Sequence, residues 1–274
     1  MIFRILISVI FIAILFFFAL DSRLSVTNYE INSAKVSSEN SYRIVLIADL
    51  HNCFLGEDQV DIISKIKLQN PDIIVLCGDI ADNVKPFIGA KVFLEKVVEI
   101  APVYYVTGNH EFRTRNIDNV KADIRKTGVT ILDNEMKTVN INGANVNIYG
   151  IDDPFLFEYT DYSDEKDWES LLKGLWQDKE GEYNILISHR PEEVDEYKKY
   201  NYDLILTGHA HGGQVIVPYL IDGLFAPDQG FFPKYTNGLI EYNNTKQIIS
   251  RGVANNQKVP RVFNRPEVVV VDIK

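Results

Sequence analysis

The chain has 274 residues, of which 46% are hydrophobic, and its formal net charge is −10 with a pI near 5.0. This length suits one large domain or two small ones, and the hydrophobic fraction is sufficient for a buried core. The acidic balance and the lack of a basic patch argue against a specific nucleic-acid partner. The two cysteines, Cys53 and Cys77, form no disulfide framework, and neither has metal-ligand spacing.

The first twenty residues differ from the rest of the chain, because Ile5 to Leu20 contains no charged side chain. As a helix this run spans about 24 Å, and residues 1–3 extend it toward the ~30 Å of a bilayer core. A cleaved secretory signal is the alternative, although a clean small-x-small cleavage site is lacking. We therefore predict a transmembrane anchor or signal segment at residues 1–22, favour the uncleaved anchor, and expect the protein at the cell membrane.

A polar, Ser- and Asn-rich stretch follows and is predicted as a linker at residues 23–41, leading to one globular domain at 42–274. From residue 42 onward, apolar runs typical of buried strands alternate with apolar residues at helical spacing. Strands are expected at 42–48, 72–77 and 103–106, with helices near 60–66, 93–100 and 117–124. Alternation around Asn142-Gly143 then predicts a β-hairpin. A helix is expected at 163–176, and further strands at 184–187, 204–206, 239–242, 247–250 and 268–273.

Five of these strands end in a cluster of Asp, Asn or His residues. The clusters are Asp49-Leu50-His51, Gly78-Asp79, Gly108-Asn109-His110-Glu111, Ser188-His189 and Gly208-His209-Ala210-His211. On an extended chain alternate residues point the same way, so each cluster with two ligand-type residues should aim both at one place. Ligands of open α/β sheets bind at the carboxyl ends of strands, so the five clusters can converge on one site.

All five histidines of the chain occupy these strand ends. Each polar residue taken alone has a structural alternative, because Asp49 and Asp79 could cap helices and Asn109 could sit in a turn. Five histidines in five equivalent positions nevertheless favour a shared metal site over unrelated structural roles.

Together the five clusters resemble the signature of the calcineurin-like metallophosphoesterases, with no substitution at a ligand position. The resemblance runs from about Tyr42 to the C-terminus. Residues 212–214, 224–232 and 264–267 are similar to a bacterial subgroup whose members often carry an N-terminal membrane or export segment. The resemblance implies an α/β fold, a four-layer α/β-β-α sandwich in which two mixed sheets are flanked by helices.

The resemblance also implies a centre of two divalent metal ions. One ion would be held by Asp49, His51, Asp79 and His211. The other would be held by Asp79, Asn109, His189 and His209, with Asp79 bridging. His110 would be no ligand, but a general acid or a clamp on the phosphoryl oxygen. The mixed nitrogen and oxygen ligands suit Mn²⁺, Fe or Zn²⁺, of which we favour Mn²⁺.

Elementary electrostatics agrees with these roles. Two divalent ions about 3.5–4 Å apart repel one another and need shared anions, which a carboxylate and a hydroxide can provide. Two carboxylates leave the site net positive, so it attracts phosphate. We predict a dinuclear-metal-dependent phosphoesterase that hydrolyses a phosphodiester or pyrophosphate through a metal-activated bridging hydroxide. The substrate would be a small molecule or a membrane-proximal lipid.

Two alternatives come from other classes. One is a non-catalytic, membrane-tethered scaffold on the same fold, and the other is a zinc hydrolase of C–N bonds. Outside the clusters, Arg113 and Arg190 could hold a substrate phosphate or form ion pairs. The acids at 152 and 153 could reach the site or lie in a solvated turn, and the aromatic run at 225–232 could face a lipid or pack as a loop.

Overall fold

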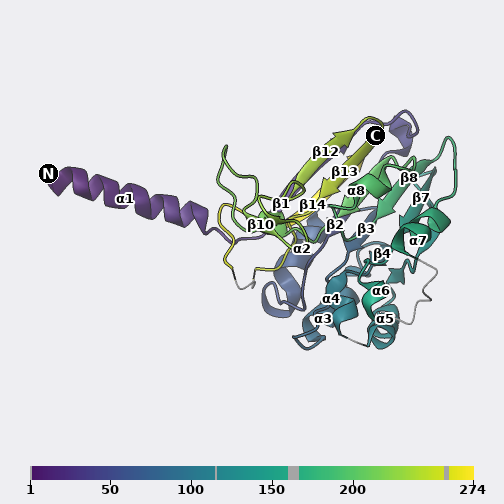
Figure 1. Ribbon diagram of the computed structural model, residues 1–274, viewed down its shortest axis with the longest axis horizontal. Helices are drawn as coiled ribbons and strands as arrows, with labels where there is room; N and C mark the ends of the chain where they lie inside the picture. Colours follow the sequence, from purple (N-terminus) through teal and green to yellow (C-terminus); the bar gives the residue numbers. More distant parts are fainter. Residues whose placement is uncertain (1, 115, 160–166, 256–258) are drawn as a thin grey trace.

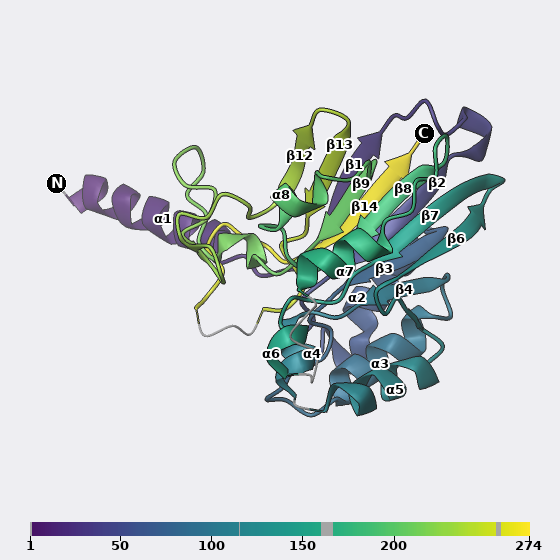
Figure 2. The same ribbon diagram turned by 45° about the vertical axis from the view of Figure 1, so that its right-hand side comes forward.

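The computed structural model describes residues 2–114, 116–159, 167–255 and 259–274. Two sheets of six strands lie face to face, and helices cover the outer face of each sheet (Figures 1 and 2). Each sheet contains both parallel and antiparallel neighbours. The predicted α/β fold, with two mixed sheets flanked by helices, is therefore confirmed.

The first sheet has the strand order β1-β14-β2-β3-β4-β5. Its strands are β1 (Ser25–Ile31), β14 (Glu267–Ile273), β2 (Tyr42–Ile47), β3 (Ile73–Cys77), β4 (Val103–Val106) and β5 (Thr130–Ile131). From β2 to β5 neighbouring strands are parallel, whereas β14 is antiparallel to β2. The carboxyl ends of β2, β3 and β4 therefore share one edge of this sheet.

The second sheet has the order β12-β13-β9-β8-β7-β6. Its strands are β12 (Gly238–Tyr242), β13 (Thr245–Ile249), β9 (Leu204–Thr207), β8 (Tyr183–Ile187), β7 (Ala144–Gly150) and β6 (Glu135–Ile141). The four central strands are parallel, and each outer pair is antiparallel. The β6–β7 hairpin turns at Asn142 and Gly143, whose φ angles of 49° and 89° suit a tight hairpin turn.

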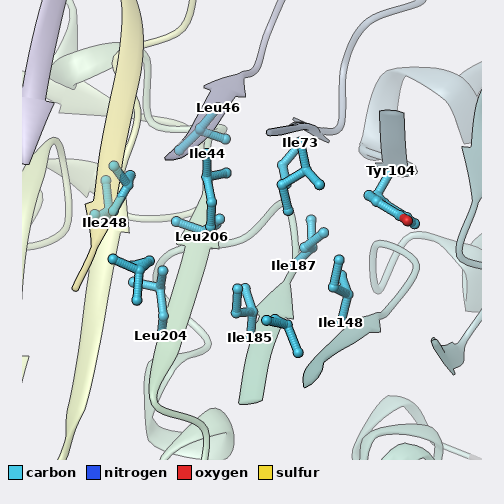
Figure 3. Close-up of a cluster of buried hydrophobic side chains, with 14 of the residues drawn as sticks. Ile44, Leu46, Ile73, Tyr104, Ile148, Ile185, Ile187, Leu204, Leu206 and Ile248 are labelled. Carbon is cyan, nitrogen blue, oxygen red and sulfur yellow. The ribbon is translucent and has the colours of Figure 1, made fainter. Parts of the chain in front are cut away.

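The space between the sheets is filled by apolar side chains from both of them (Figure 3). On β2, Ile44 and Leu46 face this interior, where Leu206 of β9 also packs, while Val45 and Ile47 face the covering helices. All five are fully buried. Because both faces of the central strands are covered, their sequences are continuous apolar runs, which is why the sequence predicted them.

Helices α2 (Val60–Leu68), α3 (Ile88–Val97) and α5 (Ile117–Lys126) pack on the first sheet, and α7 (Trp168–Leu175) and α8 (Val194–Tyr197) on the second. Of the helix predicted at 163–176, residues 163–166 lie outside the described residues. The smaller elements are α4 (Asn109–Arg113), α6 (Leu156–Tyr159), η1 (Ser38–Asn40), η2 (Glu57–Gln59), η3 (His211–Gly213), β10 (Phe225–Ala226) and β11 (Gly230–Phe231).

The prediction of a linker at residues 23–41 is wrong for the segment that forms β1. This strand pairs in parallel with β14 along its whole length, from Ser25 opposite Glu267 to Ile31 opposite Ile273. Most of its side chains are exposed or half-buried, because it lies at the edge of the sheet. A polar edge strand lacks the apolar run by which the buried strands were predicted.

The prediction of a membrane anchor at residues 1–22 is also wrong. Within residues 2–114, 116–159, 167–255 and 259–274, no helix has the length and apolar character needed to cross a membrane. Helix α1 covers Ile2–Ala19, 18 residues. The predicted membrane partner and cell-membrane location are corrected on the same finding. The helix projects from the body of the molecule (Figure 1). Its last residue is tied to that body, because the Phe263 N–H donates to the Ala19 carbonyl at 2.7 Å.

Candidate metal centre

The ends of β2, β3 and β4 in the first sheet meet the ends of β8 and β9 in the second. The predicted ligands follow these strands in chain order: Asp49, His51, Asp79, Asn109, His189, His209 and His211. Each of these residues is at most 6% exposed. The convergence of the strand ends therefore places the predicted ligand residues together in a buried site.

The backbone at most of these positions is left-handed. The φ angle is 55° at Asp49, 50° at His51, 52° at Asp79, 67° at His209 and 48° at His211. The prediction that these pairs project from an extended chain is therefore wrong, although each pair does point into one site. Left-handed non-glycine residues cost ~1–3 kcal/mol each and cluster at functional sites. Here the turn after β2 is tied to the turn after β3, since the His51 N–H donates to the Asp79 carbonyl at 2.9 Å.

Two glycines allow the strand ends to approach one another. A Cβ at Gly78, where φ is 79°, would lie 2.6 Å from His189 Nδ1, and a Cβ at Gly108 would lie 2.3 Å from Asp79 Oδ1. Both distances are too short for non-bonded atoms, so a larger residue would displace a site residue. The glycines of these two clusters thus serve close packing around the site.

Asp49, His51 and His211 form one group whose candidate ligand atoms all lie within 4.8 Å of one another. His51 Nε2 lies 3.4 Å from His211 Nε2, which lies 3.8 Å from Asp49 Oδ1. Asp79 Oδ2 lies 3.8 Å from His51 Nε2. The four residues predicted to hold one metal ion are therefore neighbours in space.

Asp79, His189 and His209 form a second group within the same limit of 4.8 Å. Asp79 Oδ2 lies 3.3 Å from His189 Nε2, which lies 3.1 Å from His209 Nδ1. The Asp79 carboxylate consequently lies between the two groups. This is the place where two neighbouring cations would need a shared anion.

The orientation of two imidazole rings fits a metal ion. The Cys77 carbonyl accepts from His189 Nδ1 at 2.7 Å, and the Asp228 carboxylate accepts from His209 Nε2 at 2.8 Å. Carbonyl and carboxylate oxygens only accept, so these two nitrogens carry the ring protons. In neutral rings the lone pairs of His189 Nε2 and His209 Nδ1 then face each other at 3.1 Å. A cation bound by both nitrogens relieves that repulsion.

Burial keeps most of the rings neutral and leaves one position that attracts positive charge. It lowers the pKa of His51 and of His209 to about 4, so both offer lone pairs at neutral pH. Burial also opposes charge on His189, but the facing Asp79 carboxylate outweighs it and raises the pKa of His189 to about 10. Burial by itself would raise the pKa of Asp79, yet His189 holds it well below its usual range. Between these two residues a proton takes the place that a metal cation would fill.

Asn109 and Arg113 lie on the short helix α4. One end of the Asn109 carboxamide lies 3.2 Å from His209 Nδ1, and the other lies 2.9 Å from Arg113 Nη1. With its nitrogen toward His209, the amide makes both hydrogen bonds; with its oxygen toward His209, it can ligate a metal but gives up Arg113. The Arg113 guanidinium is exposed and stacks on Phe155, with Cζ 4.8 Å from the ring centroid.

His110 lies beside the two groups and is more open than the ligands. Its side chain is 26% exposed, and its Nε2 lies 4.0 Å from Asp79 Oδ2. Asp82 Oδ2 lies 4.0 Å from His110 Nδ1 and 3.6 Å from His51 Nδ1, so this carboxylate faces both rings. Asp82 was not predicted as a site residue, and its only signal in the sequence is a second aspartate three residues after Asp79.

Glu111 had no role assigned from the sequence, and the structure gives it one. Its fully buried carboxylate accepts from the N–H groups of Asp79 at 3.0 Å, Ala81 at 2.8 Å and Gly108 at 2.8 Å. Burial raises the pKa of Glu111 to about 8. These hydrogen bonds tie the turn after β3 to the turn after β4.

The remaining acids and arginine lie in ion pairs. Arg190 Nε donates to Asp153 Oδ2 at 2.6 Å, which confirms the ion-pair alternative for Arg190. Asp152 accepts from Thr107 Oγ1 at 2.5 Å and from Lys121 Nζ at 2.8 Å. Both acids are at most 2% exposed, so neither lies in a solvated turn.

Comparisons with known proteins show what the chain is similar to. Residues 42–213 match the family described as Calcineurin-like phosphoesterase. An uncharacterized metallophosphoesterase of Aquifex aeolicus is 31% identical over 261 residues, which cover 92% of each chain. The uncharacterized metallophosphoesterase YkoQ of Bacillus subtilis is 29% identical over 230 residues, 82% of this chain and 81% of its own. Among solved structures, a dimetal phosphatase from Danio rerio aligns with a TM-score of 0.46 and 13% identity, over 77% of this chain and 88% of that one.

Proposed function

The chain belongs to the calcineurin-like phosphoesterase family of metal-dependent hydrolases, and from that premise we propose that its substrate is a phosphodiester or a pyrophosphate. The metal-dependent chemistry is supported by the groups of ligand-type side chains on both sides of Asp79, and the substrate class by the exposed aromatic side chains near Asp228. A scaffold that had abandoned catalysis would have no need of the full set, so we set that alternative aside.

The proposed ligands fall into two sets that share one carboxylate. One ion would be held by Asp49, His51, Asp79 and His211. The other would be held by Asp79, Asn109, His189 and His209. When bound, the two ions would neutralise phosphoryl oxygens and lower the pKa of a water molecule. A mixture of imidazole, carboxylate and amide ligands suits Mn²⁺, Fe or Zn²⁺.

His110 is proposed as the general acid. Its ring is partly exposed and its Nε2 lies 4.0 Å from Asp79 Oδ2, so an oxygen of the substrate can reach it beside the ligands. A leaving alkoxide needs a proton, which an imidazolium can donate from Nε2. Asp82 Oδ2 faces Nδ1 of the same ring at 4.0 Å, on the side away from the proposed substrate oxygen.

Arg113 is proposed to bind a non-bridging phosphoryl oxygen. Its Nη1 lies 3.5 Å from His110 Nε2, and the Phe155 ring supports the guanidinium plane. Because a guanidinium only donates, Arg113 has to turn away from this nitrogen before Nε2 can carry the proton of the general acid. When Asn109 turns its oxygen toward a metal ion, Arg113 loses that partner and its donors become available to the substrate. Arg190 has no such freedom, because Asp153 occupies two of its nitrogens.

Exposed aromatic side chains favour a substrate that carries a second organic group on the phosphate. Phe225 is 44% exposed, Phe231 71% and Phe232 68%, and they surround the turn that carries Asp228, a partner of His209. A monoester has one organic group, whereas a diester or a substituted pyrophosphate has a second group that can lie on this surface. An apolar substituent would gain the most from such a contact.

The test is hydrolysis by the purified full-length chain with Mn²⁺, with metal content measured in parallel. Bis-p-nitrophenyl phosphate and a nucleoside diphosphate ester represent the proposed class, and p-nitrophenyl phosphate represents the monoesters. We expect a higher kcat/KM for the first two. Faster turnover of the monoester would overturn the substrate class, and a metal-loaded chain that cleaves none of the three would overturn the proposal as a whole.

A further inference from the structure

The hairpin formed by β10 and β11 brings an acidic side chain to the site from a region outside the five clusters. Its strands pair Phe225 with Phe231, and Asp228 lies in the connecting turn with a left-handed φ of 59°. The next residue, Gln229, fixes the turn, since its side chain donates to the Tyr235 carbonyl at 2.8 Å and accepts from the Tyr235 N–H at 2.9 Å. The position of Asp228 is therefore set by the hairpin.

The Asp228 carboxylate determines which nitrogen of His209 carries the proton. Asp228 Oδ2 lies 2.8 Å from His209 Nε2, and a carboxylate oxygen can only accept. In a neutral ring Nδ1 is then unprotonated, and this is the nitrogen that faces His189 Nε2 at 3.1 Å. The opposite tautomer would point an N–H at the proposed metal position.

Asp228, whose side chain is 49% exposed, contacts a buried ion pair in turn. Arg190 Nη1 contacts the Asp228 carboxylate, while Arg190 Nε and Nη2 donate to Asp153 at 2.6 and 3.0 Å. Asp153 is fully buried and Arg190 is 6% exposed. The three side chains form a continuous line from the end of β7 to His209.

The surroundings of Asp228 are not a third metal site. Glu192, His209 and Asp228 do gather ligand-type atoms within 4.8 Å of one another. However, the Arg190 guanidinium contacts the carboxylates of both Glu192 and Asp228. A permanent cation thus already contacts both acids, and a metal ion there would face its repulsion.

We propose that Asp228 is a positioning residue of the metal centre, which fixes His209 in the tautomer that presents Nδ1 to a metal ion. Arg190 and Asp153 set the place of the carboxylate. The inference rests on the proposed function only in taking His209 as a ligand. Partners that orient a ligating imidazole typically change metal affinity by ~10–100-fold when removed.

The closing experiment compares Asp228→Ala, Asp228→Asn and the control Asp222→Ala. Asp222 is an exposed acid in the same loop, so the control removes the same charge without reaching His209. Ring ¹⁵N–¹H correlation spectra of the metal-free full-length chain, assigned with His209→Gln, report the tautomer. We expect Nε2 protonation of His209 in the wild type, Asp228→Asn and Asp222→Ala, because an amide oxygen still accepts, and a mixture of tautomers in Asp228→Ala.

Titration with Mn²⁺, followed by electron paramagnetic resonance of the free ion, gives the second readout. One site of Asp228→Ala should bind about 10–100-fold more weakly, whereas Asp228→Asn should recover most of the affinity and Asp222→Ala should match the wild type. The inference would be overturned if Asp228→Ala kept both the wild-type tautomer and the wild-type affinity. It would also be overturned if the Ala and Asn variants lost affinity equally while the tautomer stayed unchanged. A wild-type chain that binds no Mn²⁺ would overturn the proposed function instead, and the spectra of the metal-free chain would still decide the role of Asp228.

Discussion

The two sheets contribute unlike halves of the candidate centre. The first sheet supplies every proposed oxygen ligand and one imidazole: Asp49, Asp79, Asn109 and His51. The second sheet supplies imidazoles only: His189, His209 and His211. The carboxylates thus lie on one half and most of the imidazoles on the other, so neither sheet alone offers a complete set of ligands. The centre exists only where the two sheets pack together.

The two halves are also held in place by different interactions. In the first sheet, Glu111 accepts from three backbone N–H groups and ties two strand ends together. In the second, the line of Asp153, Arg190 and Asp228 holds His209 through side chains. Backbone hydrogen bonds leave the strand ends of the first sheet little freedom to move. The hairpin that carries Asp228 lies outside the sheets, and within the described residues it has no such bonds to Glu111. We therefore expect the second half to be the more adjustable one.

Asp79→Asn should have the largest effect, because it removes the carboxylate that both halves share. Loss of the bridging charge should release at least one ion and lower kcat/KM by about 10³-fold or more, since metal ions contribute several kcal/mol to such reactions. Metal analysis and bis-p-nitrophenyl phosphate turnover check this. Asp222→Asn is the matched control, and full turnover by Asp79→Asn would refute the bridging role.

His110→Ala should separate proton donation from metal binding within the first half. Both ions should remain, while kcat falls by roughly 10²–10⁴-fold for a substrate with an alkyl leaving group. The loss should be smaller for bis-p-nitrophenyl phosphate, because p-nitrophenolate leaves without a proton. Comparing the two substrates at constant metal content is the measurement. A variant that loses its metals would show that His110 is a ligand instead.

Glu111→Gln should loosen the backbone frame of the first half. An amide NH₂ in place of one carboxylate oxygen leaves a buried N–H without an acceptor, which costs ~1–3 kcal/mol. Urea unfolding should show this loss relative to Glu57→Gln, a control at an exposed position. Identical unfolding midpoints in the two variants would contradict the structural role.

Arg113→Ala should have the smallest effect, confined to substrate binding. Removing one exposed charged donor should raise KM roughly tenfold with little change in kcat. Arg113→Lys should recover part of the loss, because the ammonium keeps the positive charge. Recovery should be incomplete, because an ammonium cannot bind two oxygens side by side. Arg125→Ala, on the outer helix α5, is the control. A fall in kcat at unchanged KM would place Arg113 with the reacting groups.

The central strands and the clusters that follow them were accessible from the sequence for a physical reason. Strands covered on both faces need continuous apolar runs, so 42–48, 72–77 and 204–206 stand out without any structure. Each run stops at a polar cluster, and in parallel strands these stops lie at one edge. The edge strand β1 carries no such run.

The residues that orient the ligands could not be predicted from the sequence, because they are distant from the clusters along the chain. Asp228 lies nineteen positions after its partner His209, in a loop whose path no local pattern fixes. The left-handed turns at Asp49 and His209 were also missed, since a positive φ is uncommon at any non-glycine residue, even though aspartate and histidine adopt it more often than most.

The sequence by itself determined the family, the positions of the buried strands along the chain and the identity of the residues at their ends. Burial and local spacing can be recognised from consecutive residues, which is why these features were predictable. Only the tertiary structure decided which nitrogen of each ring faces the site and which carboxylate lies between the two groups. Those features depend on hydrogen bonds between segments that meet only when the two sheets pack.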